Sequence, residues 1–441
     1  MRHLSLGLLG LVGCSALLAC HRTQASPTPP VAAVDAAPTV AHFEAVDARQ
    51  LSASAGTEAQ TEPSLAITPS GEVLIAWMEQ RAGTSTTLGI RFSPDEGKTW
   101  GPVETLASPD GRSATQPVVV ADGKGNIFVA WVATGRDGPG GVADSHVYVA
   151  RREGGSGKFG EPVEVSTDMR RGSRFGAPWM TISGTGAALV AWTYQQAMGD
   201  GIAVARSEDG VTWARSIVIE RVGLQARFPY LCASHQGPSA WVTYLDGDVG
   251  VRIRASDDGG LSWSPARVAT VSVADEKPRV VNDITPCVGD GDEVTVAYGR
   301  ARGNDAGAGA ATVADSLVLA KSFDGGRTFD ARRILDLGPT SALHPQMARE
   351  ADGPIDLAFY ASASDPDAGS LRWMRAADNL SPLGGARVAR DKVRFDAKPQ
   401  GRAWPGGYFG WQWRDGALYA ALADATDDNL PHIAFTRVTT P

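Results

Sequence analysis

Four copies of one short motif constrain the fold of this chain more than any other feature. Each copy places a serine two residues before an aspartate, follows it with a glycine and ends on an aromatic residue. The copies are residues 93–100 (SPDEGKTW), 207–213 (SEDGVTW), 256–263 (SDDGGLSW) and 322–329 (SFDGGRTF). Glycine adopts backbone angles that other residues disfavour, and an aspartate accepts hydrogen bonds from nearby turn amides. The motif therefore predicts a tight turn that recurs at four places.

A longer repeat encloses these motifs and predicts seven similar units. Six units open with a proline and continue into an apolar run that ends on an aromatic residue 12 to 15 positions later. The prolines are Pro63, Pro117, Pro178, Pro229, Pro286 and Pro345, and the aromatic residues are Trp77, Trp131, Trp192, Tyr244, Tyr298 and Tyr360. In a degenerate seventh unit, Tyr408 stands in the proline position, and residues 418–423 and 432–438 are the expected second and third strands.

The short apolar runs are rich in Val, Ile, Trp and Tyr and alternate with glycine and aspartate turns, which is typical of all-β structure. A repeated unit of four such strands is the blade of a β-propeller. The seventh unit shows no fourth strand, whereas residues 42–51 (HFEAVDARQL) form a spare strand-like segment near the N-terminus. We therefore predict an all-β propeller of seven four-stranded blades that is closed by this N-terminal strand.

The motif resembles the Asp box, or BNR repeat, of the sialidase-like β-propellers, and the resemblance covers residues 58–438. That superfamily usually has six blades, so six blades is the alternative to seven. The resemblance implies that the motif is structural and lies on the face opposite the binding cleft. This role falls to the carboxylates Asp95, Asp209, Asp258 and Asp324 and to the aromatic residues Trp100, Trp213, Trp263 and Phe329.

The first 19 residues are expected to be a lipoprotein signal peptide and not part of the fold. An apolar run at 4–18 leads to Leu17-Leu18-Ala19-Cys20, which resembles the lipoprotein box whose cysteine is acylated after cleavage. The alternatives are a similar box that ends at Cys14 and a secretory peptide that is cleaved elsewhere. Residues 20–40, rich in proline and alanine, are expected to be a tether, and residues 41–441 the propeller.

The expected location is the bacterial envelope, with a lipid anchor in the membrane. His21 stands where lipoproteins that stay at the inner membrane carry an aspartate, so we expect the outer membrane or the cell surface. The formal net charge of −8 predicts no nucleic-acid partner. We expect a monomer. The seven histidines show no metal-ligand spacing, so we expect neither a metal ion nor a cofactor.

Two cysteines remain once Cys14 is cleaved off and Cys20 is acylated. Cys232 follows Pro229 by three residues and Cys287 follows Pro286 by one, so both belong to innermost strands of neighbouring blades. An even number of cysteines in an exported protein favours a disulfide. We expect this bond between blades four and five, with two buried free thiols as the alternative.

Arginines gather in the loops that precede each opening proline and follow each second-strand aromatic residue. Because strands in a blade alternate in direction, these loops share one face, opposite the motif turns. A guanidinium group suits bidentate capture of a carboxylate or a sulfate. The candidate ligand-binding residues are Arg81, Arg136, Arg174, Arg227 and Arg279. The alternative is that these arginines are solvated or paired with nearby acidic residues such as Glu79 and Asp200.

The catalytic pattern that the resemblance implies is only partly present. Sialidases carry three arginines for the substrate carboxylate, a tyrosine nucleophile with a glutamate partner, an aspartate acid/base and an aromatic-Arg-Ile-Pro segment in the first blade. Here the first-blade segment is Thr61-Glu62-Pro63-Ser64, with a carboxylate and no arginine, and Arg227-Phe228-Pro229-Tyr230 lies in the fourth repeat. The weak catalytic candidates are Tyr194 with Glu79 or Asp200 as partner, whereas Tyr244, Tyr298 and Tyr360 are expected to be packing residues.

Three functions are consistent with these features. The first is a non-catalytic binding module that recognises a glycan or a protein through its arginine-bearing face, and the missing first-blade signature favours it. The second is an exo-acting glycosidase of the sialidase type. The third is a scaffold for envelope assembly. Fold alone cannot choose among them.

Overall fold

The computed structural model describes residues 32–33, 42–46, 51, 57–81, 83–135, 144–155, 157–167, 173–196, 199–221, 226–246, 250–270, 279–280, 284–301, 314, 316–329, 331–337, 341–350, 353–362, 368–394, 396–397, 403–404, 409–425 and 431–439. The regular structure in these ranges is almost entirely strand, with a short 3-10 helix at Pro109–Gly111. No helix in these ranges is long and apolar enough to cross a membrane.

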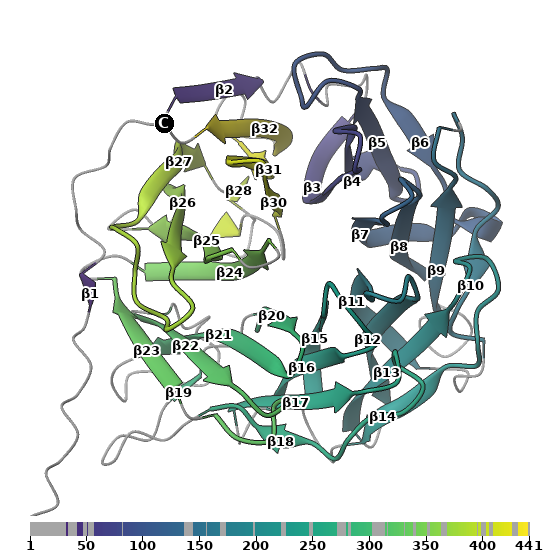
Figure 1. Cartoon of the computed structure of the whole chain (residues 1–441). Coiled ribbons are helices and arrows are strands. Elements are labelled where there is room, and N and C mark those ends of the chain that lie inside the picture. The colour runs from purple at the N-terminus through teal and green to yellow at the C-terminus, as the bar shows by residue number, and fades with distance from the viewer. Residues whose placement is uncertain are drawn as a thin grey trace, which may run out of the picture. The chain divides into compact units, whose positions relative to one another are not determined.

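Seven antiparallel blades of four strands form a ring (Figure 1). Blade one holds β3 (Thr57–Ile67), β4 (Val73–Arg81), β5 (Thr87–Ser93) and β6 (Glu104–Leu106). Blade two holds β7 (Ser113–Ala121), β8 (Ile127–Thr134), β9 (Ser145–Arg152) and β10 (Val163–Glu164). Blade three holds β11 (Arg174–Ile182), β12 (Ala188–Gln196), β13 (Gly199–Ser207) and β14 (Ile217–Arg221). Blade four holds β15 (Ala226–Ala233), β16 (Ala240–Asp246), β17 (Gly250–Ser256) and β18 (Arg267–Val268).

Blade five has a divided innermost strand, because β19 (Arg279–Val280) and β20 (Cys287–Asp290) both pair with its second strand. The remaining strands of this blade are β21 (Glu293–Ala301), β22 (Ser316–Ser322) and β23 (Ala331–Asp336). Blade six holds β24 (Ser341–Arg349), β25 (Ile355–Ser362), β26 (Ala368–Ala376) and β27 (Arg387–Arg394). A small hairpin, β28 (Asp396–Ala397) and β29 (Ala403–Trp404), precedes blade seven.

Blade seven combines a strand from near the N-terminus with the last three strands of the chain. It holds β30 (Gly410–Arg414), β31 (Ala417–Asp424), β32 (His432–Thr439) and the N-terminal β2 (His42–Val46). β2 pairs antiparallel with β32, from His42 opposite Thr439 to Val46 opposite Phe435. The prediction of seven blades closed by an N-terminal strand is therefore confirmed, and the six-blade alternative is wrong. Closure of this kind covers the free edge of the last blade with a strand from the same chain.

A further strand lies in the segment that the sequence predicts to be a tether. β1 (Ala32–Ala33) pairs in parallel with the outermost strand of blade five, where Ala32 lies opposite Leu335 and Ala33 opposite Asp336. Figure 1 shows β1 beside β23 and β2 beside β32. Residues 32 and 33 thus pair with blade five, and residues 42–46 then pair with blade seven.

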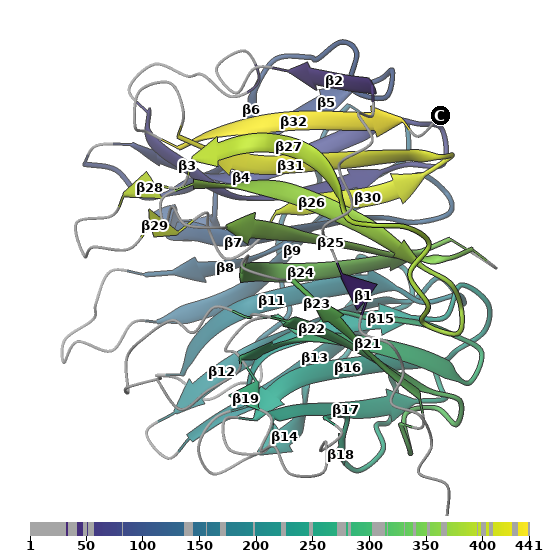
Figure 2. The ribbon, with the colours of Figure 1, turned by 90° about the vertical axis from the view of Figure 1, so that its left-hand side faces the viewer.

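The two faces of the ring differ in the turns that they carry. One face carries the turns between the first and second strands and those between the third and fourth strands of each blade, and we call it the motif-turn face. We call the opposite face the front face. In Figure 2 β30 and β32 point to the right, toward the motif-turn face, and β28 and β29 lie at the left, on the front face. Figure 1 therefore views the motif-turn face. The innermost strands of all seven blades line a central channel of about 560 Å³.

The same hydrogen bonds between the motif serine, aspartate and glycine recur within each of the four motif turns. In the turn of blade five, the Ser322 hydroxyl accepts from the Gly326 amide at 2.8 Å and donates to Asp324 at 2.8 Å. Asp324 in turn accepts from the amide and the hydroxyl of Thr328 at 2.8 and 2.7 Å. These donors, the Thr328 amide foremost, lower the pKa of Asp324 to about 2. The carboxylate therefore holds the turn together in its ionised form.

Each motif glycine also packs against the preceding blade. The glycines have positive φ angles between 70° and 92°, in the left-handed region that favours glycine. A Cβ atom on Gly97 would lie 2.3 Å from Phe435 of blade seven, and one on Gly260 would lie 2.5 Å from Leu189 of blade three. Gly210 approaches Phe128 of blade two in the same way. The motif is thus a contact between blades as well as a turn.

A second set of contacts ties innermost strands together near the axis. The Val119 amide of blade two donates to the Ser64 hydroxyl of blade one at 3.0 Å, and the Ala177 amide of blade three donates to Gln116 of blade two at 2.9 Å. Gln412 of blade seven accepts from the backbone of blade one at 2.9 Å. These bonds satisfy amide groups that the regular sheet ladders leave unpaired.

The residue before the opening proline has a positive φ angle in five blades. The five are Glu62 (54°), Gln116 (55°), Ala177 (48°), Phe228 (54°) and His344 (51°). The pairing of the first two strands shifts register at the same place in each of these blades. Because proline has no N–H group, the bulge leaves no backbone donor of this residue without a hydrogen bond. The repeated proline therefore marks a bulge, which the sequence repeat alone did not predict.

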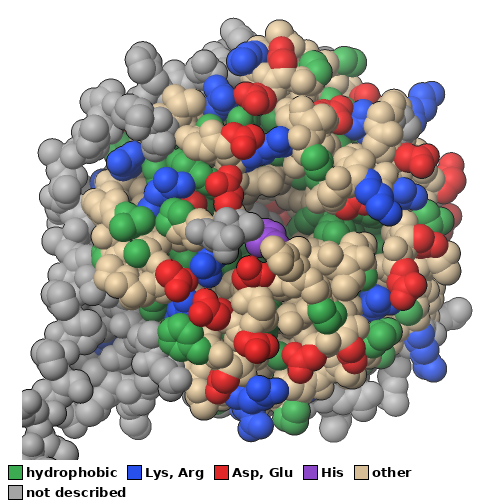
Figure 3. All heavy atoms as spheres, in the orientation of Figure 1, with side chains coloured by type: hydrophobic (Ala, Val, Ile, Leu, Met, Phe, Trp, Pro, Cys, Tyr) green, Lys and Arg blue, Asp and Glu red, His purple; other side chains and the backbone are tan. Residues whose placement is uncertain are grey.

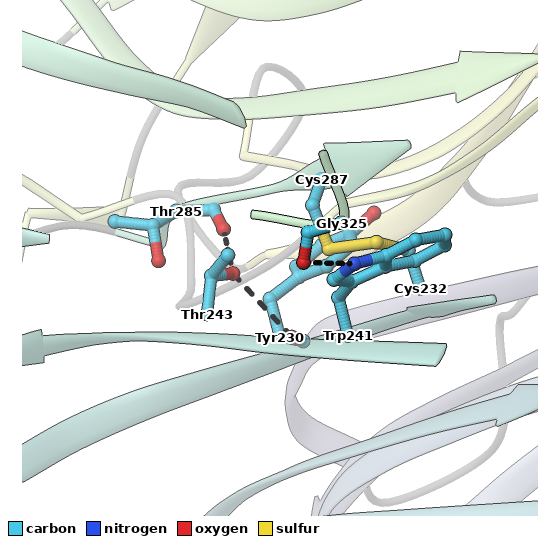
Figure 4. The surroundings of a disulfide bond; sticks show 7 residues. All are labelled: Tyr230, Cys232, Trp241, Thr243, Thr285, Cys287 and Gly325. Atoms are coloured by element: carbon cyan, nitrogen blue, oxygen red, sulfur yellow. Dashed lines mark hydrogen bonds between the residues drawn. A yellow bond between two sulfur atoms is a disulfide. The ribbon is translucent and has the colours of Figure 1, made fainter. Parts of the chain in front are cut away.

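A disulfide between Cys232 of β15 and Cys287 of β20 joins the innermost strands of blades four and five. Figure 4 shows it beside Trp241, whose ring nitrogen donates to the Gly325 carbonyl at 3.2 Å. The Thr243 hydroxyl donates to the Thr285 carbonyl across the same junction, at 2.5 Å. The pairing expected from the sequence is present, and it links the two blades where the innermost strand of blade five is divided.

The carboxylate of a motif turn is expected to stabilise the fold, whereas its acidic neighbour is not. Asp258 accepts hydrogen bonds from Ser256 and Ser262, and the adjacent Asp257 is exposed. We expect Asp258→Ala to lower the free energy of unfolding by about 1–2 kcal/mol, because it leaves turn donors unpaired. Asp257→Ala is the matched control and should leave the urea unfolding curve unchanged. Equal effects of the two substitutions would contradict the role given to the motif.

Removal of the disulfide is expected to destabilise the whole ring. The bond closes a sequence separation of 55 residues, and a loop of this length corresponds to about 2–4 kcal/mol of unfolding free energy. The double variant Cys232→Ala and Cys287→Ala should therefore unfold at a lower denaturant concentration. Alkylation followed by peptide mapping is the control: in the unreduced, denatured chain neither cysteine should react. Two reactive thiols there would disprove the bond.

Candidate functional site

The front face of blades three and four holds an arginine and carboxylate pair. Arg227, near the start of β15, donates from Nε to Oδ2 of Asp200 on β13 at 2.5 Å. Gln195 of β12 donates to the same carboxylate oxygen at 3.4 Å. The side chain of Asp200 is 9% exposed and that of Arg227 is 46% exposed. A buried carboxylate thus fixes one edge of a guanidinium group whose other edge faces water.

Strand register brings a second arginine to this place. Arg174, the first residue of β11, lies opposite Gln195, and Gln195 lies opposite Asp200. Directly opposed residues of antiparallel strands point to the same side of the sheet. The three side chains therefore share the face of blade three that meets Arg227. Arg174 is exposed and makes no ion pair with any described residue. We call these four residues the Arg174–Arg227 site.

The site can bind an anion through hydrogen bonds and charge. Asp200 occupies only Nε of Arg227, and no described group accepts from its two terminal nitrogens. Those two nitrogens can donate together to the two oxygens of one carboxylate. Asp200 cancels part of the positive charge, but it also holds the guanidinium group in one orientation. Arg174 supplies the excess positive charge that attraction of an anion requires.

Arg81, the first-blade candidate, is held in a pair of its own. Its Nε and Nη2 atoms both donate to Glu79 on the same strand, at 2.8 and 2.5 Å. Glu79 is buried and also accepts from Gln60, whose carbonyl oxygen lies 3.3 Å from Nδ1 of His432 in blade seven. The structure thus places Arg81 at the junction of blades seven and one, apart from the Arg174–Arg227 site. Arg81 is thus paired with a nearby acidic residue, which is the alternative that the sequence left open.

Several predicted residues fall outside the part of the chain that the structure describes. Arg136 and the acylation site Cys20 lie there, as does Tyr408. Arg279 is on β19 in blade five, but its side chain is not described. Of the five predicted arginines, the structure therefore brings Arg174 and Arg227 together.

Tyr194 does not meet either of the carboxylates suggested as its partner. It lies opposite Gly201 on β13, one residue out of step with Asp200, so the two side chains point to opposite faces of blade three. Its hydroxyl donates to the backbone carbonyl of Glu220 at 3.4 Å. Glu79 lies in the junction of blades seven and one. The hypothesis of a Tyr194 nucleophile paired with Glu79 or Asp200 is therefore wrong, because strand alternation separates the groups.

The structure does contain a tyrosine and glutamate pair, at a place that the sequence did not indicate. Tyr244 of β16 donates from its hydroxyl to Oε2 of Glu220, which extends from β14 of the neighbouring blade. Arg254 of β17 donates to the same oxygen at 3.0 Å. No spacing in the sequence could reveal this cluster, because its members lie on strands of two different blades.

Burial makes Tyr244 a packing residue and not a nucleophile. Its side chain is fully buried between blades three and four. Desolvation by burial, together with the Glu220 carboxylate, raises the pKa of the Tyr244 phenol. Burial also raises the pKa of Tyr360, and Tyr298 is 2% exposed. A tyrosine nucleophile needs access to substrate and a phenol that loses its proton easily, so the packing role expected for these residues agrees with their surroundings.

The first-blade segment also differs from a sialidase site. Glu62 has a positive φ angle in the bulge before Pro63, and Ser64 accepts from the backbone of blade two. No arginine stands at this bulge, whereas Arg227 stands at the equivalent bulge of blade four, two residues before Pro229. No cluster of three or more His, Cys, Asp or Glu side chains suited to a metal ion occurs among the described residues.

The Tyr244 and Glu220 pair is expected to stabilise the contact between blades three and four. We expect Tyr244→Phe to lower the free energy of unfolding by about 1–3 kcal/mol, because a buried hydrogen bond to a charged group is lost. Tyr194→Phe is the matched control, since its hydroxyl makes a longer bond to a neutral carbonyl, and it should cost less than about 1 kcal/mol. Urea denaturation measures both. A larger effect at Tyr194 would contradict this assignment.

Comparison with known proteins gives similarity at the level of the fold. No family model matches this sequence, and no curated protein matches it either. Among solved structures, a protein of unknown function from Dyadobacter fermentans is 17% identical, with a TM-score of 0.52 over 89% of this chain and 97% of that one. A Trypanosoma rangeli sialidase in complex with the inhibitor DANA is 12% identical, with a TM-score of 0.50 over 90% of this chain and 60% of that one.

A Hadza microbial sialidase gives a TM-score of 0.48 at 16% identity, over 70% of this chain and 66% of that one. The chain thus spans less than two thirds of the length of both sialidases. At such identities the similarity to the Dyadobacter fermentans and Trypanosoma rangeli structures shows a shared fold and carries no residue assignments with it.

Proposed function

We propose that this protein is a non-catalytic binding module that takes the carboxylate of an acidic glycan at the Arg174–Arg227 site. The observation that carries the proposal is the arrangement of Arg227, whose Nε is held by the buried Asp200 while its terminal nitrogens face water. A guanidinium group fixed in this way suits bidentate binding of a carboxylate. The front face would then bind the ligand, and the motif-turn face would hold the blades together.

The choice of binding over catalysis rests on the described tyrosines. Tyr194, Tyr244, Tyr298 and Tyr360 are all buried, and burial raises the pKa of Tyr244 and Tyr360. These positions favour packing over nucleophilic attack. The choice of a glycan is supported by the shared fold with a sialidase that binds the inhibitor DANA. A protein ligand with an exposed carboxylate is the other outcome that the binding test can reveal.

The proposed location is the bacterial envelope, with the chain anchored by an acylated Cys20. The apolar run at 4–18 and the Leu17-Leu18-Ala19-Cys20 box support it. A lipid anchor would keep the propeller at the membrane and leave the front face free to meet a glycan. Mass spectrometry of the mature chain would reveal the acyl groups and the cleavage site.

An exo-acting glycosidase of the sialidase type is the competing function, and an envelope scaffold is the weaker one. A fluorogenic sialoside, scanned from acid to neutral pH, separates the first two. We expect no turnover by the mature chain, together with retention on immobilised sialylated or uronic-acid glycans. Turnover that disappears in Arg174→Ala or Arg227→Ala would instead establish the glycosidase. Neither turnover nor retention would favour the scaffold.

Substitution of the two arginines tests the proposed binding site directly. We expect Arg227→Ala to weaken glycan binding by about tenfold or more, since a charge-assisted bidentate contact is lost. Arg227→Lys should restore little of it, because an ammonium group lacks the planar fork. Arg174→Ala should weaken binding in the same direction. Arg327→Ala, exposed on the motif-turn face, is the matched control and should leave the dissociation constant unchanged in titration calorimetry.

A further inference from the structure

A second arginine beside the Arg174–Arg227 site is held in the same way as Arg227. Arg252 of β17 donates from Nε to Oδ2 of Asp246, the last residue of β16, at 2.5 Å. The side chain of Asp246 is 7% exposed and that of Arg252 is 25% exposed. No described group accepts from the two terminal nitrogens of Arg252. A buried carboxylate therefore fixes a second guanidinium group by one edge and leaves its other edge available.

Strand register places this pair in the same junction as the Arg174–Arg227 site. Arg252 lies opposite Tyr244, and Asp246 follows Tyr244 by two residues on β16. Opposed residues and alternate residues of antiparallel strands point to the same side of a sheet. Tyr244 contacts Glu220 of blade three, so Asp246 and Arg252 also face blade three. The Arg174–Arg227 site joins the same two blades.

The fixed guanidinium groups follow one another outward from the axis of the ring. Arg227 is on the innermost strand of blade four, next to Ala226, which lies opposite Asp246. Arg252 is on the third strand of the same blade. Neighbouring strands are about 4.8 Å apart, so the backbones of the first and third strands are about 10 Å apart. We call Arg174, Arg227 and Arg252 the arginine row.

Another arginine of this junction shows the contrast with a structural role. Arg254, two residues after Arg252, donates from Nε and Nη2 to Glu220 at 3.3 and 3.0 Å. Its Nη1 donates to the Ser264 carbonyl at 2.7 Å. All three nitrogens of Arg254 thus serve the fold. Arg252 and Arg227 each give one nitrogen to a buried carboxylate, and packing of the blades does not account for the other two.

The charge of the row differs from that of the opposite face. The three positive charges of the row are set against two negative ones, on Asp200 and Asp246, which leaves an excess of one positive charge. The formal net charge of the whole chain is −8. Figure 3 views the motif-turn face, where acidic and basic side chains are intermixed around a central hollow. The row therefore attracts an anion, but the small excess makes affinity depend on hydrogen bonds from the guanidinium groups.

We propose that the arginine row binds two carboxylates of one ligand, carried by different sugars of an acidic oligosaccharide such as an oligogalacturonate. This inference rests on the proposed function and deepens it. Arg227 with Arg174 takes the carboxylate of one sugar, and Arg252 takes that of a sugar further along the chain. A single sugar acid has one carboxylate and fills only one of the two places. Two contacts in one molecule make the second binding step intramolecular, which raises the affinity.

The affinities for a monomer and a trimer of one sugar acid test the proposal. Galacturonate and trigalacturonate are titrated into the mature chain by calorimetry at one ionic strength. We expect the trimer to bind about tenfold more tightly than the monomer or better, after correction for its three carboxylates. The methyl-esterified trimer has lost its charges and should not bind.

Substitution of Arg252 tests whether this residue provides the second place. Arg252→Lys keeps a cation beside the buried Asp246, so the variant should fold, but it lacks the planar fork. We expect the advantage of the trimer over the monomer to fall to about twofold or less. Arg227→Ala should weaken the binding of both sugars.

Arg267→Ala is the matched control for the loss of charge. Arg267 is exposed on β18 of the same blade, opposite Ile253, whose side chain packs toward blade five. The substitution removes one positive charge from the other side of blade four, so the affinities for both sugars should stay unchanged. Circular dichroism confirms that each variant is folded.

Three results would overturn the proposal. Equal affinities of the wild-type chain for the two sugars, after the correction, would show a site for one carboxylate and would leave the proposed function intact. An unchanged advantage of the trimer in Arg252→Lys would show that Arg252 takes no carboxylate of its own. Binding of neither sugar would also overturn the inference, and retention of sialylated glycans by the same sample would then decide whether the proposed function survives.

Discussion

The packing of each blade against the one before it is the interaction on which this structure depends. A single four-stranded blade buries neither of its faces, so it gains stability only when a neighbour covers them. The motif turns contribute to that contact in two ways. Their aspartates hold the turn, as the lowered pKa of Asp324 reflects, and their glycines let Phe435, Leu189 and Phe128 of the preceding blades approach the backbone. The ring then closes through β2, which covers the edge of blade seven.

The two faces of the ring therefore have different roles. Polar bonds and apolar contacts of the motif turns fix the spacing of the blades on one face, and the disulfide adds a covalent link between blades four and five. The opposite face is then free to carry side chains that the packing does not use. Arg227 is such a side chain, because Asp200 occupies only one of its nitrogens. Arg81 is not, because Glu79 occupies two. The same residue type thus has two roles, decided by its neighbours.

Strand alternation explains why the candidate site could be predicted only in part. Arg174 and Arg227 could be placed on the front face, since every loop before an opening proline lies there. From the sequence, Asp200, the partner of Arg227, could not be distinguished from Glu79, because both acids follow the aromatic residue of a second strand. Tyr194 and Asp200 are close in sequence, yet a register that opposes Tyr194 to Gly201 turns them to opposite sides of the blade. The Tyr244 and Glu220 pair joins strands of two blades and has no sequence signal at all.

The sequence by itself determined the all-β class, the seven repeats and the closing N-terminal strand, because strand period, turn residues and repeat length are local properties of the chain. The turns of blades three to six could also be placed on one face from the order of their strands. Only the tertiary structure decided which charged groups meet, which tyrosines are buried and which apolar side chains remain exposed. Those outcomes depend on contacts between blades, and the distances that set them come from the curvature of the closed ring.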